Sequence, residues 1–194
     1  MSVFSTLLNN SGFQLGLTDP VTNGQEDWLF LFNENDFILT YSSTNPLILI
    51  GITPAVAGNA IRQFFGTNNS FKPSVKSQAT EVGPRYKEEL DFNIAGNSSV
   101  IKQQMLSLGY GRVKAFVVNN FKSTDAAIEL YGAQNGLLAT EAEKSETSLG
   151  GWKIKLTGPD KLLEPYPPRS VWIPPVSGTA TYASSLAAIT ALVQ

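Results

Sequence analysis

The clearest pattern in the chain is an alternation of apolar and polar residues at positions 85–94. The apolar positions share one face of an extended strand and are Tyr86, Leu90, Phe92 and Ile94. The polar positions share the other face and are Arg85, Lys87, Glu89, Asp91 and Asn93. Because successive side chains of a strand point to opposite faces, this period of two predicts a strand with one buried and one wet face.

A helix is predicted directly after this strand, at residues 98–108. Its apolar stripe consists of Val100, Ile101, Met105 and Leu108. Asn97 or Ser98 can cap its N-terminus, and Gly109 can close its C-terminus. The pattern therefore indicates a strand followed by a helix.

Three further strands are predicted at residues 112–118, 126–131 and 152–157. In the last of these, Trp152, Ile154 and Leu156 point inward, whereas Lys153 and Lys155 point outward. Residues 138–148 are rich in Glu and are interpreted as a solvated loop or a short exposed helix.

The N-terminal half also contains strand signals. Two aromatic runs, 28–32 and 37–41, predict a hairpin with apolar residues on both faces, which must be covered by its own domain or by a neighbouring subunit. A short buried strand is predicted at 46–51, whereas 53–65 fits either a short helix or a loop leading into a strand. Residues 66–83, with a strand-like centre at 71–79, are expected to form a long hairpin loop or a subunit-contacting loop.

These patterns divide the chain into a core with flanking arms. Residues 1–26 are expected to form an N-terminal arm or an irregular opening strand, and residues 27–158 the β core. Prolines should exclude residues 159–178 from a central sheet, so this segment is predicted to be an extended arm. Residues 179–194 carry apolar residues at helical spacing and predict a docked terminal helix. The fold class is therefore mainly β with one or two helices.

Composition narrows the classes of function. The chain has 194 residues, 42% of them hydrophobic, which is enough for one domain with a sizeable core. Only 15% are charged, against roughly a quarter in typical domains, and a weakly charged surface fits contact with other subunits. With a net charge of −2, tight binding of nucleic acid through phosphate contacts is not expected.

No catalytic, cofactor-binding or metal-binding residue is predicted. The sequence contains neither Cys nor His, which excludes the commonest metal sites, thiol nucleophiles and imidazole chemistry. Glu88, Glu89 and Asp91 could be paired carboxylates for acid–base work. However, the strand period separates Glu88 from the other two, and nothing nearby in the sequence predicts a raised carboxyl pKa. We interpret these acids as a solvated strand face, and an enzyme is not predicted.

Neither a membrane segment nor an export signal is indicated. The longest apolar runs, around 47–52 and 185–193, are too short to span a bilayer. The first residues lack the basic start and apolar run of a secretory signal peptide. We therefore expect a soluble protein that is made in the cytoplasm.

Four stretches in the middle and late chain carry a family likeness. They are residues 86–92, 101–120, 129–137 and 150–158. Over these stretches the chain resembles virion proteins of phages and prophages, in particular the tail tube proteins of tailed bacteriophages.

The resemblance implies a β-sandwich or barrel with a flanking helix, assembled as a hexameric ring, with rings stacked into a tube for genome passage. It implies no cofactor. The partners would be further copies of the chain and other tail proteins such as tape measure, terminator and sheath proteins. The location would be the virion tail, assembled in the host cytoplasm, and DNA would pass without specific binding.

Under this resemblance, the residues expected to face the lumen are Lys87, Glu89, Asp91, Lys153 and Lys155. Their mixed sign would let DNA slide, because grip on phosphates scales with basic contacts. The alternatives are another virion ring or surface protein (a tail terminator, a head–tail connector or a capsid decoration protein) or a soluble β-sandwich binding module.

Overall fold

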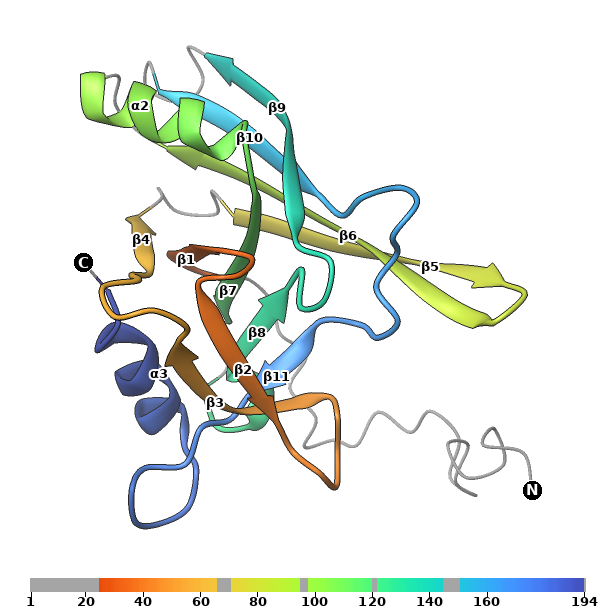
Figure 1. The fold of residues 1–194 in the computed structure, drawn as a ribbon, viewed down its shortest axis with the longest axis vertical. Coiled ribbons are helices and arrows are strands. Elements are labelled where there is room, and N and C mark those ends of the chain that lie inside the picture. Colours follow the sequence, from red (N-terminus) through yellow and green to blue (C-terminus); the bar gives the residue numbers. More distant parts are fainter. Residues whose placement is uncertain (1–24, 66–70, 95–97, 120–121, 145–150, 194) are drawn as a thin grey trace.

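A computed structural model shows the fold of the chain (Figure 1) and describes residues 25–65, 71–94, 98–119, 122–144 and 151–193. The described residues form one sheet of 11 strands with two α-helices. Strands account for 51% of the described residues, so the predicted mainly-β fold with few helices is confirmed. The N-terminal arm predicted at residues 1–26 lies almost wholly outside the described residues.

The strands follow one another along most of the chain. Their bounds are β1 (Gln25–Asn33), β2 (Phe37–Tyr41), β3 (Ile48–Pro54), β4 (Arg62–Phe65), β5 (Phe71–Thr80), β6 (Gly83–Ile94), β7 (Arg112–Asn119), β8 (Ile128–Tyr131), β9 (Leu137–Lys144), β10 (Trp152–Thr157) and β11 (Arg169–Val171). The helices are α2 (Ser99–Leu108) and α3 (Tyr182–Thr190), and a 3-10 turn, η1, spans Asp125–Ala127. In the sheet the strand order is β2-β3-β11-β8-β7-β9-β10-β6-β5, with β1 paired to β7 and to β4.

Strands β1 and β7 lie at the centre of the molecule and are buried on both faces. Leu29 and Leu31 of β1 belong to a first hydrophobic cluster, whereas Phe30 and Phe32 belong to a second one on the other face. β7 divides in the same way, with Val117 in the first cluster and Phe116 in the second. The prediction that the apolar run at 28–32 must be covered on both faces is thus confirmed for β1.

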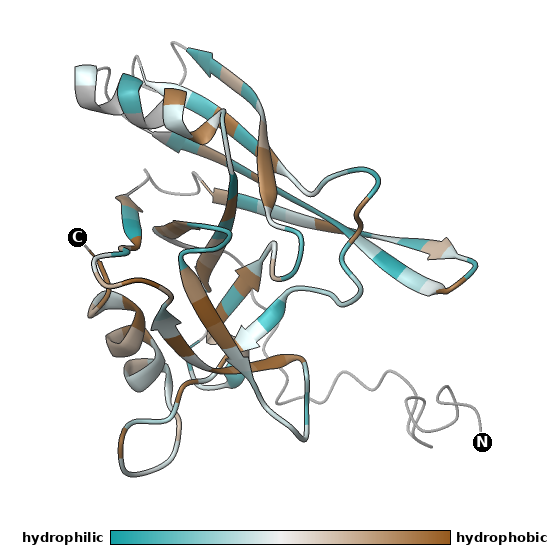
Figure 2. Cartoon of the chain, viewed as in Figure 1, coloured by the Kyte–Doolittle hydropathy of each residue, from teal (hydrophilic) through white to brown (hydrophobic). Residues whose placement is uncertain are grey.

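The meander of β5, β6, β10 and β9 covers the first cluster. Leu90 and Phe92 of β6 and Ile154 and Leu156 of β10 point into that cluster. The residues between them point outward, so the alternation predicted at 85–94 is present. The β5–β6 hairpin continues beyond the cluster and projects from the body (Figure 1), and it is mostly hydrophilic (Figure 2).

The second cluster is enclosed by β2, β3, β8, β11 and α3. Helix α3 begins with a capping box, in which Thr181 and Ser184 each accept a backbone N–H of the other. Ile189 of this helix is fully buried, and Ser185 accepts a hydrogen bond from Ile173 N at 2.9 Å. A terminal helix was expected at 179–194, and α3 lies within that range.

The prediction of a hairpin between the runs 28–32 and 37–41 is wrong. β1 pairs with β4 and β7, whereas β2 pairs with β3. Because both edges of the doubly buried β1 are occupied, no edge of it is left for β2. A turn in which Asn33 Nδ2 donates to Asp36 Oδ2 at 2.7 Å instead leads the chain into β2.

Two further segments differ from the expectation. Residues 138–148 were expected to be a loop or an exposed helix, but β9 extends to Lys144. A register shift against β10 places Ala139 opposite Leu156 and Ala142 opposite Ile154, so both alanines lie on the inward side of the strand. The proline-rich segment 159–178 was excluded from the sheet, yet β11 lies between β3 and β8. The prolines flank this three-residue strand, so they remove none of its hydrogen bonds.

The structure also gives the bounds of three other segments. Residues 53–65 contain a loop leading into β4, not a helix, and residues 71–80 form β5 of the hairpin with β6. The strand predicted at 126–131 begins at Ile128, because Ala126 and Ala127 belong to η1, whose N-terminus is capped by Thr124.

Candidate functional site

The outward side of β9, β10, β6 and β5 is one continuous polar face, and we call it the polar face. Residues directly opposite each other in antiparallel strands point to the same side. The register pairs Lys76 with Lys87, Asp91 with Lys155, and Lys155 with Glu141. The five residues predicted to face a lumen (Lys87, Glu89, Asp91, Lys153 and Lys155) all lie on this face.

Ion pairs connect neighbouring strands of the polar face. Glu89 Oε2 lies 3.7 Å from Lys155 Nζ on β10 and 3.9 Å from Lys76 Nζ on β5. Lys87 Nζ donates to Asp160 Oδ1 at 2.6 Å. The hydrogen bond and charge of Lys87 lower the pKa of Asp160, and those of Asp160 raise the pKa of Lys87.

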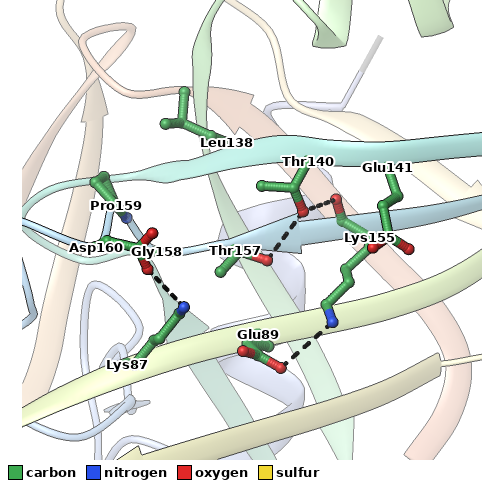
Figure 3. A pocket seen from close by; sticks show the side chains of 10 residues that line it. All are labelled: Lys87, Glu89, Leu138, Thr140, Glu141, Lys155, Thr157, Gly158, Pro159 and Asp160. Carbon is green, nitrogen blue, oxygen red and sulfur yellow. Dashed lines mark hydrogen bonds and ion pairs between the residues drawn. The ribbon is translucent and has the colours of Figure 1, made fainter.

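A groove of about 290 Å³ opens on this face where β6, β9 and β10 approach residues 158–160 (Figure 3). Lys87 and Asp160 face each other at one end, and the hydroxyls of Thr140 and Thr157 lie 3.1 Å apart beside Lys155. The groove brings together Lys87, Glu89 and Lys155 of the predicted residues. Asp91 and Lys153 lie further along the same strands, outside the groove lining.

Charge on the polar face is nearly balanced. Among the described residues, the basic side chains here are Lys72, Lys76, Arg85, Lys87, Lys153 and Lys155, and the acidic ones are Glu89, Asp91, Glu141, Glu143 and Asp160. Lys72, Asp91, Lys155 and Glu141 alternate in sign across the strands. The like-charged neighbours Lys76 and Lys87 are paired with Glu89 and Asp160, so a polyanion would meet no basic stripe. Such a face is hydrated and exerts little net attraction on DNA.

Glu88 differs from its neighbours on β6 because it points inward and is only 1% exposed. Its Oε2 accepts the N–H of Gly132 at 2.5 Å, and its Oε1 has no hydrogen-bond partner among the described residues. Burial raises the pKa of Glu88 to about 8, against the opposing effect of the Gly132 N–H. At neutral pH this carboxyl group is therefore protonated in most molecules.

Glu164 is a second buried acid, and it lies beside the turn at residues 132–136 to which Glu88 is hydrogen-bonded. Its carboxylate accepts the N–H of Asn135 at 2.7 Å and the N–H of Gln134 at 3.1 Å. Burial raises its pKa, and these two hydrogen bonds and Arg169 act in the opposite direction.

Arg169 is a buried cation that acts on both acids, with 6% exposure. Its guanidinium carbon lies 4.0 Å from the ring centre of Tyr41 and 5.0 Å from that of Tyr166. Its charge opposes the upward pKa shifts of Glu88 and Glu164. The aromatic faces and the two acids together hold a buried positive charge.

The interpretation of Glu88 as part of a solvated strand face is wrong. Glu88 occupies a position of the apolar face, between Tyr86 and Leu90, and this placement was visible in the period of two. Its hydrogen-bond donor lies 44 residues later in the chain, and no local pattern predicts such a contact. Glu164 and Arg169 lie among prolines, in a segment predicted to be an arm, and were missed for that reason.

No group of three or more acidic side chains within the described residues is arranged to hold a metal ion. Neither helix in the described part of the chain combines the length and apolar character that crossing a bilayer requires.

Comparison of the chain with protein-family models, with curated proteins and with solved structures finds no match.

Proposed function

We propose that this chain is a structural subunit of a bacteriophage tail tube, which forms rings that stack into a channel for the genome. The observation that carries the proposal is the polar face. It is continuous over four strands, hydrated and nearly neutral in charge, as a surface must be if DNA is to move along it without binding. It lies on the opposite side of the sheet from the first hydrophobic cluster, so the fold holds it rigidly.

Features suited to self-assembly support the same proposal. β2 and β5 end the strand order of the sheet, and their outer edges have no partner strand in the described chain. The end of the β5–β6 hairpin is exposed, with Val82 83% accessible. Free edges and protruding hairpins are common sites of strand pairing and contact between copies of a chain.

Electron microscopy of the purified full chain tests this proposal directly. Annular particles or tubes with an open channel are the expected result. Dispersed monomers under all conditions would contradict it and would favour a soluble binding module, whereas binding to capsid surfaces would favour a decoration protein.

Shortening the β5–β6 hairpin is expected to abolish assembly without unfolding the subunit. Residues 78–85 would be replaced by Asn-Gly, a turn suited to a two-residue hairpin. The replaced residues lie beyond the hydrophobic clusters, so the melting temperature should change little. The control replaces only Glu81 and Val82 by Asn-Gly and keeps the hairpin length. Rings formed equally well by the short variant would exclude the hairpin as an assembly contact.

Reversing one acidic charge on the polar face is expected to create DNA binding. In Glu141→Lys the face gains a basic side chain close to Lys155, its cross-strand partner. Binding of a short DNA duplex, measured by fluorescence anisotropy at several salt concentrations, should tighten by roughly threefold or more at low salt. Asp125→Lys, on η1, makes the same change in net charge away from this face. Equal effects of the two variants would show that net charge, not the polar face, controls DNA binding.

A further inference from the structure

Residues 158–168 form a strap that lies along β6, and three consecutive residues of β6 hold it. Gly158 N donates to Glu88 O at 2.8 Å, and Asp160 pairs with Lys87 at 2.6 Å. Tyr86 and Glu164 exchange both backbone hydrogen bonds at 2.9 Å. The strap is therefore fastened to its own domain, within the segment that the sequence pattern predicted to be an extended arm.

Glu88 and Glu164 approach the turn at residues 132–136 from two different elements. Glu88 of β6 binds Gly132 N, and Glu164 of the strap binds the N–H groups of Gln134 and Asn135. Gly132 and Gly136 have φ angles of 68° and 66°, and an added Cβ at either would lie about 3 Å from neighbouring atoms, so the turn needs glycine at both positions. Two carboxyl groups therefore bind the backbone of one turn.

The charges around Glu88 do not balance. The titratable groups that interact with Glu88 are Glu129 and Tyr131 from β8, Glu164 from the strap and Arg169 from β11. Two further groups lie in a second layer: Lys114 of β7 interacts with Glu164, and Tyr41 of β2 interacts with Arg169. Three carboxyl groups therefore face two cations. Glu88, with one oxygen unpartnered, is the acid for which ionisation is least favourable.

We propose that the strap is a proton-dependent latch, closed while Glu88 carries its proton and opened when the Glu88 carboxylate ionises beside Glu164. This inference is independent of the proposed function.

The strap is the element that moves, because Glu88 cannot. β6 is paired with β5 from Gly83 to Phe92 and with β10 from Glu89 to Ile94, and Leu90, two residues after Glu88, is fully buried in the first cluster. The strap is held to β6 by one backbone pair, one further hydrogen bond and an ion pair at the surface. It is held to the turn at 132–136 by the Glu164 carboxylate and by a hydrogen bond from Asn135 Nδ2 to Leu163 O at 3.4 Å. Apart from Gly158 and Glu164, its residues are exposed or only partly buried. Local opening in proteins occurs at segments with few buried contacts. Lifting the strap removes Glu164 and admits water to Glu88.

The direction of the pH dependence follows from the two states. Burial in the folded chain raises the pKa of Glu88 from 4.5 to about 8, and water that reaches Glu88 in the open state returns its pKa toward 4.5. The contribution of Glu88 to closure is therefore full below about pH 4.5, is lost as the pH rises toward 8, and changes no further above that value. The latch weakens over this window by up to about tenfold for each pH unit.

Hydrogen exchange of backbone amides, corrected for intrinsic rates, tests the latch. The protection of the Tyr86 and Glu164 amides, which form the strap pair, should fall roughly tenfold or more between about pH 5 and pH 8. The amides of β7, which exchange only when the whole domain unfolds, should stay more protected than the strap amides at every pH. In Glu88→Gln the strap amides should lose clearly less protection over this range, whereas in the control Glu89→Gln they should behave as in the wild type.

Two results would overturn the latch: strap protection that is independent of pH in the wild type, or the same loss in Glu88→Gln. Should Glu88→Gln fail to fold, Glu164→Gln gives a second test. Removing the Glu164 carboxylate lowers the pKa of Glu88. The pH above which the protection of the strap amides stops falling should therefore be lower in this variant. An unchanged value of this pH would also contradict the proposal.

Discussion

Replacing Glu88 by Gln is expected to raise the free energy of unfolding by about 2–4 kcal/mol at pH 8 and to reduce its dependence on pH. The wild-type chain must keep this buried acid protonated, with a pKa of about 8 instead of 4.5. That difference costs roughly 5 kcal/mol once the unfolded chain is fully ionised. The Gln amide removes this cost, but it places an unpartnered N–H group near the site of Oε1, which offsets about 1–3 kcal/mol.

The sign of this effect is specific. A raised carboxyl pKa in the folded state makes wild-type stability fall as the pH rises from about 4.5 to 8. Chemical denaturation of both proteins across this range, followed by tryptophan fluorescence, measures the difference. Glu89→Gln, one residue away on the polar face, is the matched control and should follow the wild-type slope. A Glu88→Gln variant that loses stability with rising pH as steeply as the wild type would show that Glu88 is not the group responsible.

Replacing Arg169 by Met is expected to destabilise the fold by about 3–5 kcal/mol at pH 8 and by clearly less at pH 5. Met retains much of the apolar volume between Tyr41 and Tyr166 but removes the positive charge facing Glu88 and Glu164. Since that charge opposes the rise in the pKa of both acids, its loss costs most where they are ionised. At pH 5 Glu88 remains protonated, so the missing charge matters less there.

Denaturation midpoints at the two pH values provide the measurement for Arg169→Met. Arg85→Met, at the base of the exposed hairpin end, changes the net charge equally and should be nearly neutral. An equal loss of stability at pH 5 and pH 8 would mean that Arg169 acts through packing against the two tyrosines alone.

Much of the fold could be predicted from local patterns. The alternation at 85–94 and the helical spacing at 98–108 depend on residues close in sequence, and both elements are present within one or two residues of the expected bounds. Partner choice was less accessible. The runs that form β1 and β2 are adjacent in sequence and strand-like, which favoured a hairpin. Instead, β1 is buried on both faces and pairs with β4 and β7. Nothing in the loop between the two runs predicts these partners.

The residues of the candidate site also differ in how well the sequence predicts them. Lys87, Glu89 and Asp91 could be assigned to one wet face from the period of two, and Lys153 and Lys155 from a second alternating run. The buried cluster could not be assembled from sequence, because Glu88, Glu164 and Arg169 meet only through the closure of the strap and the insertion of β11. An acid on an otherwise apolar strand face was the one local sign of it.

The insertion of β11 has a consequence for how the chain is made. β3 and β8 are separated in the sheet by Arg169–Val171, which are synthesised well after both. Until these residues leave the ribosome, the facing edges of β3 and β8 remain unpaired and the second cluster lacks Val171 and Ile189. Non-local pairing of this kind is slow, and incomplete sheets expose edges that aggregate. We therefore expect the chain to fold after its synthesis and not during it, with nascent chains depending on chaperones until the last strand is in place.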